Sequence, residues 1–254
     1  MKLDILAFGV HPDDVELSCA GVLLVEKLNG KKTGIIDLTQ GELGTRGTAE
    51  TRKQEAAVAA KILGVDVREN LGMADGFFKN DEAHQRQIIT ALRTYQPEII
   101  LCNAPSDRHP DHGRSASLVA EASFLSGLKK IETTVNGIQQ EAWRAKYVFN
   151  YIQDKFLQPD FVIDVTDVFE QKVEAIKAYG TQFHAPLTAA DGETGQYKES
   201  EEPQTYISTP DFLDSVLYRH KWYGKMIGVK YAEGFITEKM IGFNNFEALI
   251  KNNT

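Results

Sequence analysis

Short apolar runs alternate with amphipathic stretches in the first half of the chain. The runs have the length and composition of buried strands, and they cover residues 2–10, 33–39, 67–71 and 98–103. The stretches between and after them carry apolar side chains at helical spacing, which predicts helices over residues 15–29, 51–63, 82–95 and 114–125. Helices that connect successive strands imply a parallel sheet with helices on both faces.

The second half of the chain continues this alternation. Two further strands and two further helices are expected, at residues 146–152, 160–166, 168–179 and 211–227. Residues 184–210 differ, because they are rich in Gly, Pro, Thr and Glu and have little periodicity, which predicts a flap over a functional site. Since no linker separates a second unit, we expect one α/β domain over 1–254. Its fold would be a Rossmann-like, doubly wound, mostly parallel sheet.

Two polar loops follow two of the apolar runs. The first is GVHPDDVE (residues 9–16), and the second is DRHPDHG (residues 107–113), which follows the run ending at Asn103. In open α/β sheets, ligands bind beyond the carboxyl ends of the strands. If the two strands are neighbours, one crevice receives the side chains of His11, Asp13, Asp14, His109, Asp111 and His112.

Two histidines and a carboxylate beside an open position form a candidate divalent-metal site. Zinc accepts such ligands, and catalytic zinc sites keep one position for water. Asp13 and Asp14 would then divide the work, one binding the metal and the other accepting a proton from the bound water. Asp near a helix start is also a good N-cap, so Asp14 and Asp111 have a purely structural alternative. Two His-Pro-Asp tripeptides, each at a strand end, favour the metal site.

Charge and composition restrict the remaining classes of function. The formal net charge of −8 argues against general nucleic-acid binding. No stretch reaches the about 20 apolar residues that a membrane helix needs. The first turn, GVHPDD, lacks the G-x-G-x-x-G pattern of a dinucleotide site, and its carboxylates would repel a pyrophosphate. Cys19 and Cys102 form no disulfide framework and the N-terminus does not resemble a signal peptide, so a cytoplasmic setting is expected.

The HPDD loop with its distant HPDH loop resembles the LmbE/PIG-L family of zinc-dependent de-N-acetylases. The segments FGVHPDDVELSCAG, DLTQGELGTRGTAETRKQEA, DRHPDHGR and YAEGF are similar to the bacillithiol-biosynthesis branch of that family. Enzymes of that branch remove acetate from N-acetylglucosaminyl-malate. The resemblance therefore implies one zinc ion per chain, with other divalent metals possible, and a homo-oligomer that is commonly a hexamer.

The resemblance also implies roles for the residues of the two loops. Three of them would bind the zinc, namely His11, Asp14 and His112. Asp13 would be the general base, and His109 would polarise or protonate the tetrahedral intermediate, with Asp111 orienting His109. Val15 stands where many members have an acidic residue, so Glu16 has no assigned role beyond a possible contact behind the ligands.

Arginines near the loops indicate the chemistry of the substrate. Arg46, Arg52 and Arg108 lie on loops beside the proposed metal, although the chain is acidic overall. Because Arg binds carboxylates in a bidentate manner, an anionic substrate is expected, and the resemblance implies that it is an amino-sugar conjugate. In the resemblance, Arg52 contacts the substrate, and Arg144 matches an arginine of similar position in the branch.

Two other interpretations stay open. A related hydrolase could act on a different N-acyl sugar, such as a chitooligosaccharide or a thiol conjugate, and a metal-binding protein could lack catalysis. Only three protein ligands are expected, which favours catalysis, because structural zinc sites have four. The sequence does not select between Tyr197 and Tyr206 of the flap as a contact to the intermediate.

Overall fold

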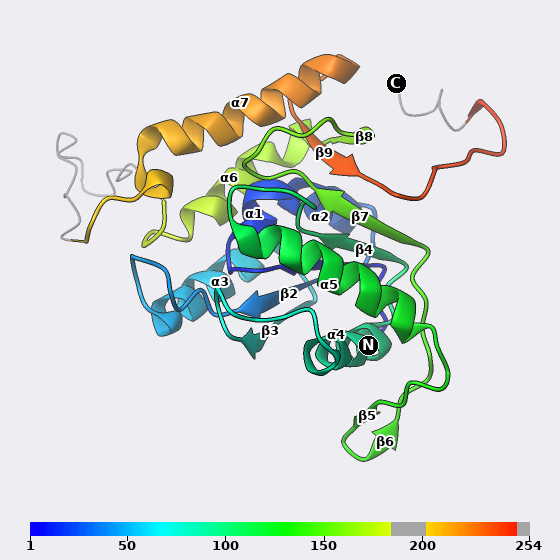
Figure 1. Ribbon diagram of the computed structural model, residues 1–254. Helices are drawn as coiled ribbons and strands as arrows, with labels where there is room; N and C mark the ends of the chain where they lie inside the picture. The colour runs from blue at the N-terminus through cyan, green and yellow to red at the C-terminus, as the bar shows by residue number, and fades with distance from the viewer. Residues whose placement is uncertain (184–201, 248–254) are drawn as a thin grey trace.

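A seven-stranded sheet forms the centre of the computed structural model, which describes residues 1–183 and 202–247 (Figure 1). The strand order is β3-β2-β1-β4-β7-β9-β8. The strands are β1 (Ile5–Gly9), β2 (Thr33–Thr39), β3 (Val67–Met73), β4 (Ile99–Cys102), β7 (Tyr147–Tyr151), β8 (Phe161–Asp164) and β9 (Ala232–Ile236). Among the described strands of this sheet, β9 runs antiparallel to β7 and β8, and the other pairings are parallel. The expected mostly parallel sheet is confirmed.

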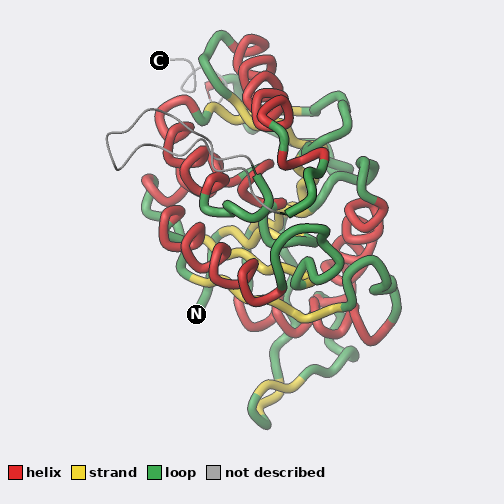
Figure 2. The backbone as a smooth tube through the Cα atoms, turned by 90° about the vertical axis from the view of Figure 1, so that its left-hand side faces the viewer, coloured by secondary structure: helices red, strands yellow, loops and turns green. Residues whose placement is uncertain are grey.

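Helices cover both faces of the sheet, as expected for a doubly wound fold (Figures 1 and 2). They are α1 (Asp14–Ser18), α2 (Ala20–Leu28), α3 (Ala49–Leu63), α4 (Glu82–Tyr95), α5 (Pro110–Ser126), α6 (Phe169–Lys177) and α7 (Pro210–Ile227). Apolar side chains of α1, α2, α3 and α6 belong to one core, and those of α4 and α5 belong to the other. Helix α7 packs mainly on β9.

Successive residues of the central strands enter opposite cores. In β1, Ile5 and Ala7 pack into the core on the α2 side, whereas Leu6 and Phe8 pack into the core on the α5 side. This period of two, with both faces buried, explains why the sequence shows continuous apolar runs instead of an apolar-polar alternation.

The helix expected over residues 15–29 is interrupted at Cys19, and this part of the prediction was wrong. The carboxylate of Glu233, on β9, lies at the N-terminus of α2. Its two oxygens accept hydrogen bonds from the backbone N–H of Gly21 at 2.8 Å and of Val22 at 2.7 Å. A carboxylate at this position satisfies unpaired N–H groups and complements the helix dipole, so the chain starts a new helix there.

Two further elements were not predicted. Strand β9 was seen only as the motif YAEGF, and a small hairpin joins β5 (Thr134–Val135) to β6 (Ile138–Gln139). Figure 1 shows this hairpin projecting from the body of the molecule. Its Asn136-Gly137 turn has positive φ at both residues, a conformation that Asn and Gly adopt readily. Of the expected flap, 184–201 lies outside the described residues, and the rest includes a short 3₁₀ helix, η2 (Tyr206–Ser208).

Strands β1 and β4 are neighbours, and they pair in parallel from Ile5 opposite Ile99 to Ala7 opposite Leu101. The chain continues from β1 to β2 and β3 on one side, and from β4 to β7 on the other. The two polar loops therefore leave the same edge of the sheet at the point where the winding direction changes, which is where ligands bind in this architecture. No helix within 1–183 or 202–247 has the length and apolarity that crossing a membrane requires.

Candidate active site

The two polar loops meet in a cavity of about 290 Å³. The HPDD turn joins β1 to α1, and the HPDH segment forms the first turn of α5. Both loops supply side chains to the cavity wall, which includes His11, Asp13, Asp14, His109 and His112. The expected convergence of the two loops is confirmed, whereas the role of each residue stays a prediction.

Asp14 is buried, and its carboxylate is surrounded by hydrogen-bond donors. Oδ2 accepts from the backbone N–H of Val10 at 2.9 Å and of His11 at 3.0 Å, and from Asn103 Nδ2 at 3.0 Å. Oδ1 accepts from Gln153 Nε2 at 2.7 Å. Burial opposes ionisation of this group, but the neighbouring histidines and the N–H donors outweigh burial and hold the pKa of Asp14 well below its usual range.

His11 is held between two carboxylates. Its Nε2 lies 2.9 Å from Asp75 Oδ1, and its Nδ1 lies 3.8 Å from Asp14 Oδ2. Asp75 is itself fixed, because its second oxygen accepts the backbone N–H of Leu43 at 3.0 Å. Burial lowers the pKa of His11, but the bond to Asp75 and the charge of Asp14 prevail and raise it.

His112 has a similar arrangement. Its Nδ1 lies 2.7 Å from Asp107 Oδ2, and its Nε2 lies 3.3 Å from Asp14 Oδ1. Asp107 is fixed by the backbone N–H groups of Arg108 at 2.7 Å and Lys155 at 2.8 Å. Burial opposes protonation, yet the two carboxylates raise the pKa of His112 to about 10. One ring nitrogen of each histidine is thus bonded to a carboxylate while the other faces Asp14.

These donors match what a divalent cation requires. Metal-binding histidines commonly have one ring nitrogen bonded to a carboxylate, which fixes the ring and directs the second nitrogen at the metal. Ring nitrogens of His11, His109 and His112 also lie within 4.8 Å of one another, beside the carboxylate of Asp14. The carboxylates of Asp14, Asp75 and Asp107 raise the pKa values of the two histidines, so the electrostatic environment of the rings favours positive charge.

Asp13 occupies an unusual backbone position beside the ligand candidates. Its φ is 131°, a conformation that a residue other than Gly adopts only when the surroundings enforce it. The carboxylate is buried, and Oδ2 accepts from Arg52 Nη1 at 2.9 Å. Burial raises the pKa of Asp13 to about 7, although Arg52 acts in the opposite direction. A carboxyl group with such a pKa can exchange a proton near neutral pH.

His109 is the N-cap of α5, where its Nδ1 accepts the backbone N–H of Asp111 at 3.3 Å. Because Nδ1 accepts, the proton of the neutral ring is on Nε2. Burial and the nearby histidines lower the pKa of His109. The carboxylate of Asp111 instead binds Arg114 Nη1 at 2.5 Å and the N–H of Gly76 at 2.8 Å. Asp111 therefore contacts the His109 ring through its backbone N–H and not through its carboxylate.

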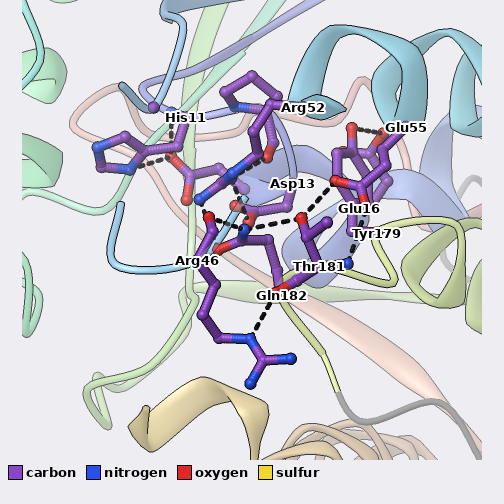
Figure 3. A network of polar contacts seen from close by, with 12 residues as sticks. His11, Asp13, Glu16, Arg46, Arg52, Glu55, Tyr179, Thr181 and Gln182 are labelled. Carbon is purple, nitrogen blue, oxygen red and sulfur yellow. Dashed lines mark hydrogen bonds and ion pairs between the residues drawn. The ribbon is translucent and has the colours of Figure 1, made fainter. Parts of the chain in front are cut away.

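Three of the four arginines singled out in the sequence line the cavity, namely Arg46, Arg52 and Arg108. Arg52 has partners within the protein: Nη1 donates to Pro12 O at 2.8 Å as well as to Asp13, and Nη2 donates to Gln182 Oε1 at 2.7 Å (Figure 3). Arg46 Nε donates to Thr181 O at 2.7 Å. The anion-binding role predicted for Arg52 stays untested.

Arg108 and Tyr206 meet at the rim of the cavity. Arg108 Nε pairs with Asp154 Oδ2 at 2.7 Å, and its guanidinium lies 5.0 Å from the centre of the Tyr206 ring. The Tyr206 hydroxyl group donates to Asp154 Oδ1 at 3.4 Å. The other tyrosine of the expected flap, Tyr197, lies outside the described residues.

The structure does not bring Arg144 to the site. Its guanidinium lies 4.7 Å from the centre of the Phe124 ring, near Gly127 at the C-terminus of α5. The cavity lies at the opposite end of this 17-residue helix, about 25 Å away at 1.5 Å per residue. We therefore leave Arg144 out of the site.

Sequence reasoning missed several residues that hold the site together. Asp107 stands inside the second motif, so its proximity to His112 was a usable signal. Asp75, Gln153 and Gln182 lie far from both motifs in sequence and follow no pattern. Glu16, left unassigned, is buried behind the first loop, where its Oε1 accepts from Arg68 Nη1 at 2.5 Å and from the Tyr179 hydroxyl group at 3.0 Å.

Comparisons with known proteins show similarity to deacetylases and to a hydratase. Residues 6–123 match the family model for GlcNAc-PI de-N-acetylase, PIG-L. Diacetylchitobiose deacetylase of Thermococcus kodakarensis is 28% identical, over 91% of this chain and 81% of its own. The probable N-acetyl-alpha-D-glucosaminyl L-malate deacetylase 2 of Bacillus subtilis is 24% identical, over 87% of this chain and 99% of its own. 4-Oxalmesaconate hydratase of Pseudomonas putida is 28% identical, over 70% of this chain and 74% of its own.

Among solved structures, the conserved protein TT1542 from Thermus thermophilus is similar to the whole molecule. The two chains are 32% identical with a TM-score of 0.81, and the match covers 95% of this chain and 97% of the other. The matched family model spans both loops of the site, from β1 into α5. On these grounds the chain belongs to the PIG-L/LmbE family of de-N-acetylases, a family of hydrolases that act on N-acetyl amides.

Proposed function

We propose that this protein is a zinc-dependent deacetylase of an anionic N-acetylglucosaminyl conjugate, with N-acetylglucosaminyl-malate as the substrate. The observation that carries the proposal is the position of Asp13. Its buried carboxylate lies directly beside imidazole and carboxylate groups that face the same cavity. A structural metal site would need no such neighbour.

We assign His11 Nδ1, a carboxylate oxygen of Asp14, and His112 Nε2 as the metal ligands. His11 and His112 each have a carboxylate behind them, whereas no carboxylate hydrogen-bonds to His109 within 1–183 and 202–247. This difference favours Asp14 over His109 as the third ligand. When bound, zinc would polarise the acetyl carbonyl and lower the pKa of a water molecule.

The residues around the metal position then have separate tasks. Asp13 accepts the proton of the attacking water, and Arg52 keeps the carboxylate in place. His109 directs a donor at the carbonyl oxygen as negative charge develops there, a contribution of about 2.7–4 kcal/mol for one such donor in comparable sites. The proton that Asp13 took from the water then passes to the departing amine.

The anionic part of the substrate would lie against Arg108 and Arg46. The ion pair of Arg108 with Asp154 uses only Nε, so the fork of its two Nη groups can face a carboxylate. Arg46 lines the same cavity. Arg52 is engaged with Asp13 and Gln182, so we assign it to the base in preference to the anion.

A second candidate function is hydration of an unsaturated polycarboxylate. It is favoured by the arginines in the cavity wall together with the similarity to 4-oxalmesaconate hydratase. The same metal position and base would serve it, but the N-acetyl group would have no role. We place either activity in the cytoplasm, in agreement with two buried free cysteines.

The test is acetate release from N-acetylglucosaminyl-malate, diacetylchitobiose and N-acetylglucosamine, each with and without a chelator. We expect the malate conjugate to have the highest kcat/KM, and Arg108→Ala to lower it more for the malate conjugate than for N-acetylglucosamine. A preference for a neutral sugar would overturn the malate assignment only. Absence of acetate from every substrate, together with hydration of 4-oxalmesaconate, would establish the second candidate.

A further inference from the structure

Gln182 lies next to Arg52, on the turn that follows α6 (Figure 3). Its side chain is buried and has three hydrogen bonds. Oε1 accepts from Arg52 Nη2 at 2.7 Å, and Nε2 donates to the carbonyl oxygen of Arg46 at 2.8 Å and to Thr181 Oγ1 at 3.0 Å. Because a guanidinium only donates and a backbone carbonyl only accepts, these partners determine the orientation of the amide.

Arg52 connects this amide to the HPDD turn. Its Nη1 donates both to the Pro12 carbonyl oxygen and to Asp13 Oδ2, so it contacts the peptide that precedes Asp13 as well as the carboxylate. Asp13 has a φ of 131° and depends on its surroundings to stay there. A chain of contacts therefore runs from Gln182 through Arg52 to Asp13.

The turn that carries Gln182 is itself anchored to α3. Both oxygens of Glu55 bind Thr181, accepting from its backbone N–H at 2.7 Å and from its hydroxyl group at 2.8 Å. Glu55 lies one helical turn after Arg52 on α3, so Gln182 and Arg52 are held relative to each other by the same helix. Without Gln182, Nη2 of Arg52 would lose this buried acceptor.

We propose that Gln182 is a positioning residue for the reaction, which acts by fixing the guanidinium of Arg52 and, through it, the carboxylate of Asp13. This inference rests on the proposed function, because it takes Asp13 as the base. Two other roles differ in their consequences. Gln182 lines the cavity and could bind substrate, or it could only brace the loop of Arg46.

The first experiment compares Gln182→Met with Gln182→Glu. Both variants lose the donor to Arg46 O, but Gln182→Glu keeps an oxygen opposite Arg52. We expect Gln182→Met to lower kcat by about 10-fold with little change in KM, since small displacements of catalytic groups are costly. Gln182→Glu should retain most of the turnover. Equal losses in both variants would indicate bracing of the Arg46 loop, and an increase in KM alone would indicate substrate binding; either result overturns the proposal.

The matched control is Gln140→Met. Gln140 Nε2 also donates to a backbone carbonyl and a threonine hydroxyl group, those of Thr90 at 3.1 Å and Thr94 at 2.8 Å, and it does not contact the site. The turnover of the Gln140→Met variant should equal that of the wild type. Bound metal should be stoichiometric in all variants, because the proposed ligands do not touch Gln182.

The second experiment is a double-mutant cycle with Arg52→Ala. If Gln182 acts through Arg52, Gln182→Met should lower kcat no further in the Arg52→Ala background, whereas multiplied losses would refute this route. A second double-mutant cycle uses the melting temperatures of the metal-free variants and does not depend on enzymatic activity. Additive decreases in melting temperature for the two substitutions would also refute the route through Arg52. A wild-type protein that releases no acetate would instead refute the proposed function.

Discussion

His11 and His112 each have one ring nitrogen bonded to a buried carboxylate and the other turned towards Asp14. These carboxylates, Asp75 and Asp107, are in turn fixed by backbone N–H groups. The site therefore consists of side chains whose rotamers are set by a second layer of contacts. Such layers govern metal affinity as well as geometry, because they orient the ligands and increase their basicity.

The first prediction concerns this second layer. Asp75→Asn and Asp107→Asn should each weaken zinc binding by about 10–100-fold, because the amide is a poorer acceptor for the imidazole N–H. The measurement is competition with a chromogenic chelator. Asp81→Asn is the matched control, since Asp81 holds His84 at 2.7 Å on the surface. Unchanged affinity in both site variants would refute the ligand assignment for His11 and His112.

The second prediction concerns the base. Asp13→Asn has the same size but cannot accept a proton, so turnover should fall by about 10²–10⁴-fold, as is typical for loss of a general base. Zinc should remain bound, and metal analysis of the purified variant checks this. Turnover near that of the wild type would remove Asp13 from the mechanism.

At the scale of elements, the HPDD turn leads into α1, a helix of only five residues that ends at the break before α2. At this break, Glu233 binds the N-terminus of α2 and pairs with Lys172 Nζ at 2.5 Å. Lys172 and Glu233 are both buried, so water cannot solvate the charge of either side chain. Burial lowers the pKa of Lys172 even though Glu233 acts to raise it.

The third prediction follows from this pair. Lys172→Met should destabilise the protein by about 3–5 kcal/mol, because the charge of Glu233 would be left buried without its cation. Unfolding in denaturant, followed by circular dichroism, measures the effect. Lys177→Met is the control: the pair of Lys177 with Glu174 is on the surface of the same helix, and such pairs contribute about 0–1 kcal/mol. Similar losses for both variants would contradict the assigned role of the buried pair.

At the scale of the whole molecule, two apolar cores lie on opposite faces of one sheet, and the proposed metal ligands belong to neither. The site lies at the edge of the sheet where β1 and β4 are neighbours. The stability of the fold therefore derives mainly from burial of apolar side chains, and a bound metal would add to it locally.

The fourth prediction is that removal of the metal abolishes acetate release but leaves the fold largely intact. A chelated sample should keep its circular dichroism spectrum at ordinary laboratory temperature and melt at a lower temperature than the zinc-loaded protein. Restored zinc should restore activity. Loss of the spectrum on chelation would show that folding itself depends on the metal.

The fifth prediction is assembly into a homo-oligomer, a hexamer by family resemblance. Light scattering over a range of protein concentrations measures it directly. A monomer at every concentration would refute the prediction without affecting the active-site proposal, because that proposal assigns its ligands and its base to residues of a single chain.

The sequence alone determined the parallel architecture and the two loops of the site. Runs such as Ile5–Phe8 are apolar at every side chain that a doubly covered strand buries, and HPDD and DRHPDH carry their chemistry within a few residues. Contacts between residues far apart in sequence were decided only by the tertiary structure. Asp75 bonds to His11 although 64 positions separate them, and Glu233 binds the N-terminus of α2, at the break in the helical pattern, from more than 200 positions away. Local periodicity indicates which face of an element is buried, but it contains no information about a polar side chain that a strand distant in sequence supplies.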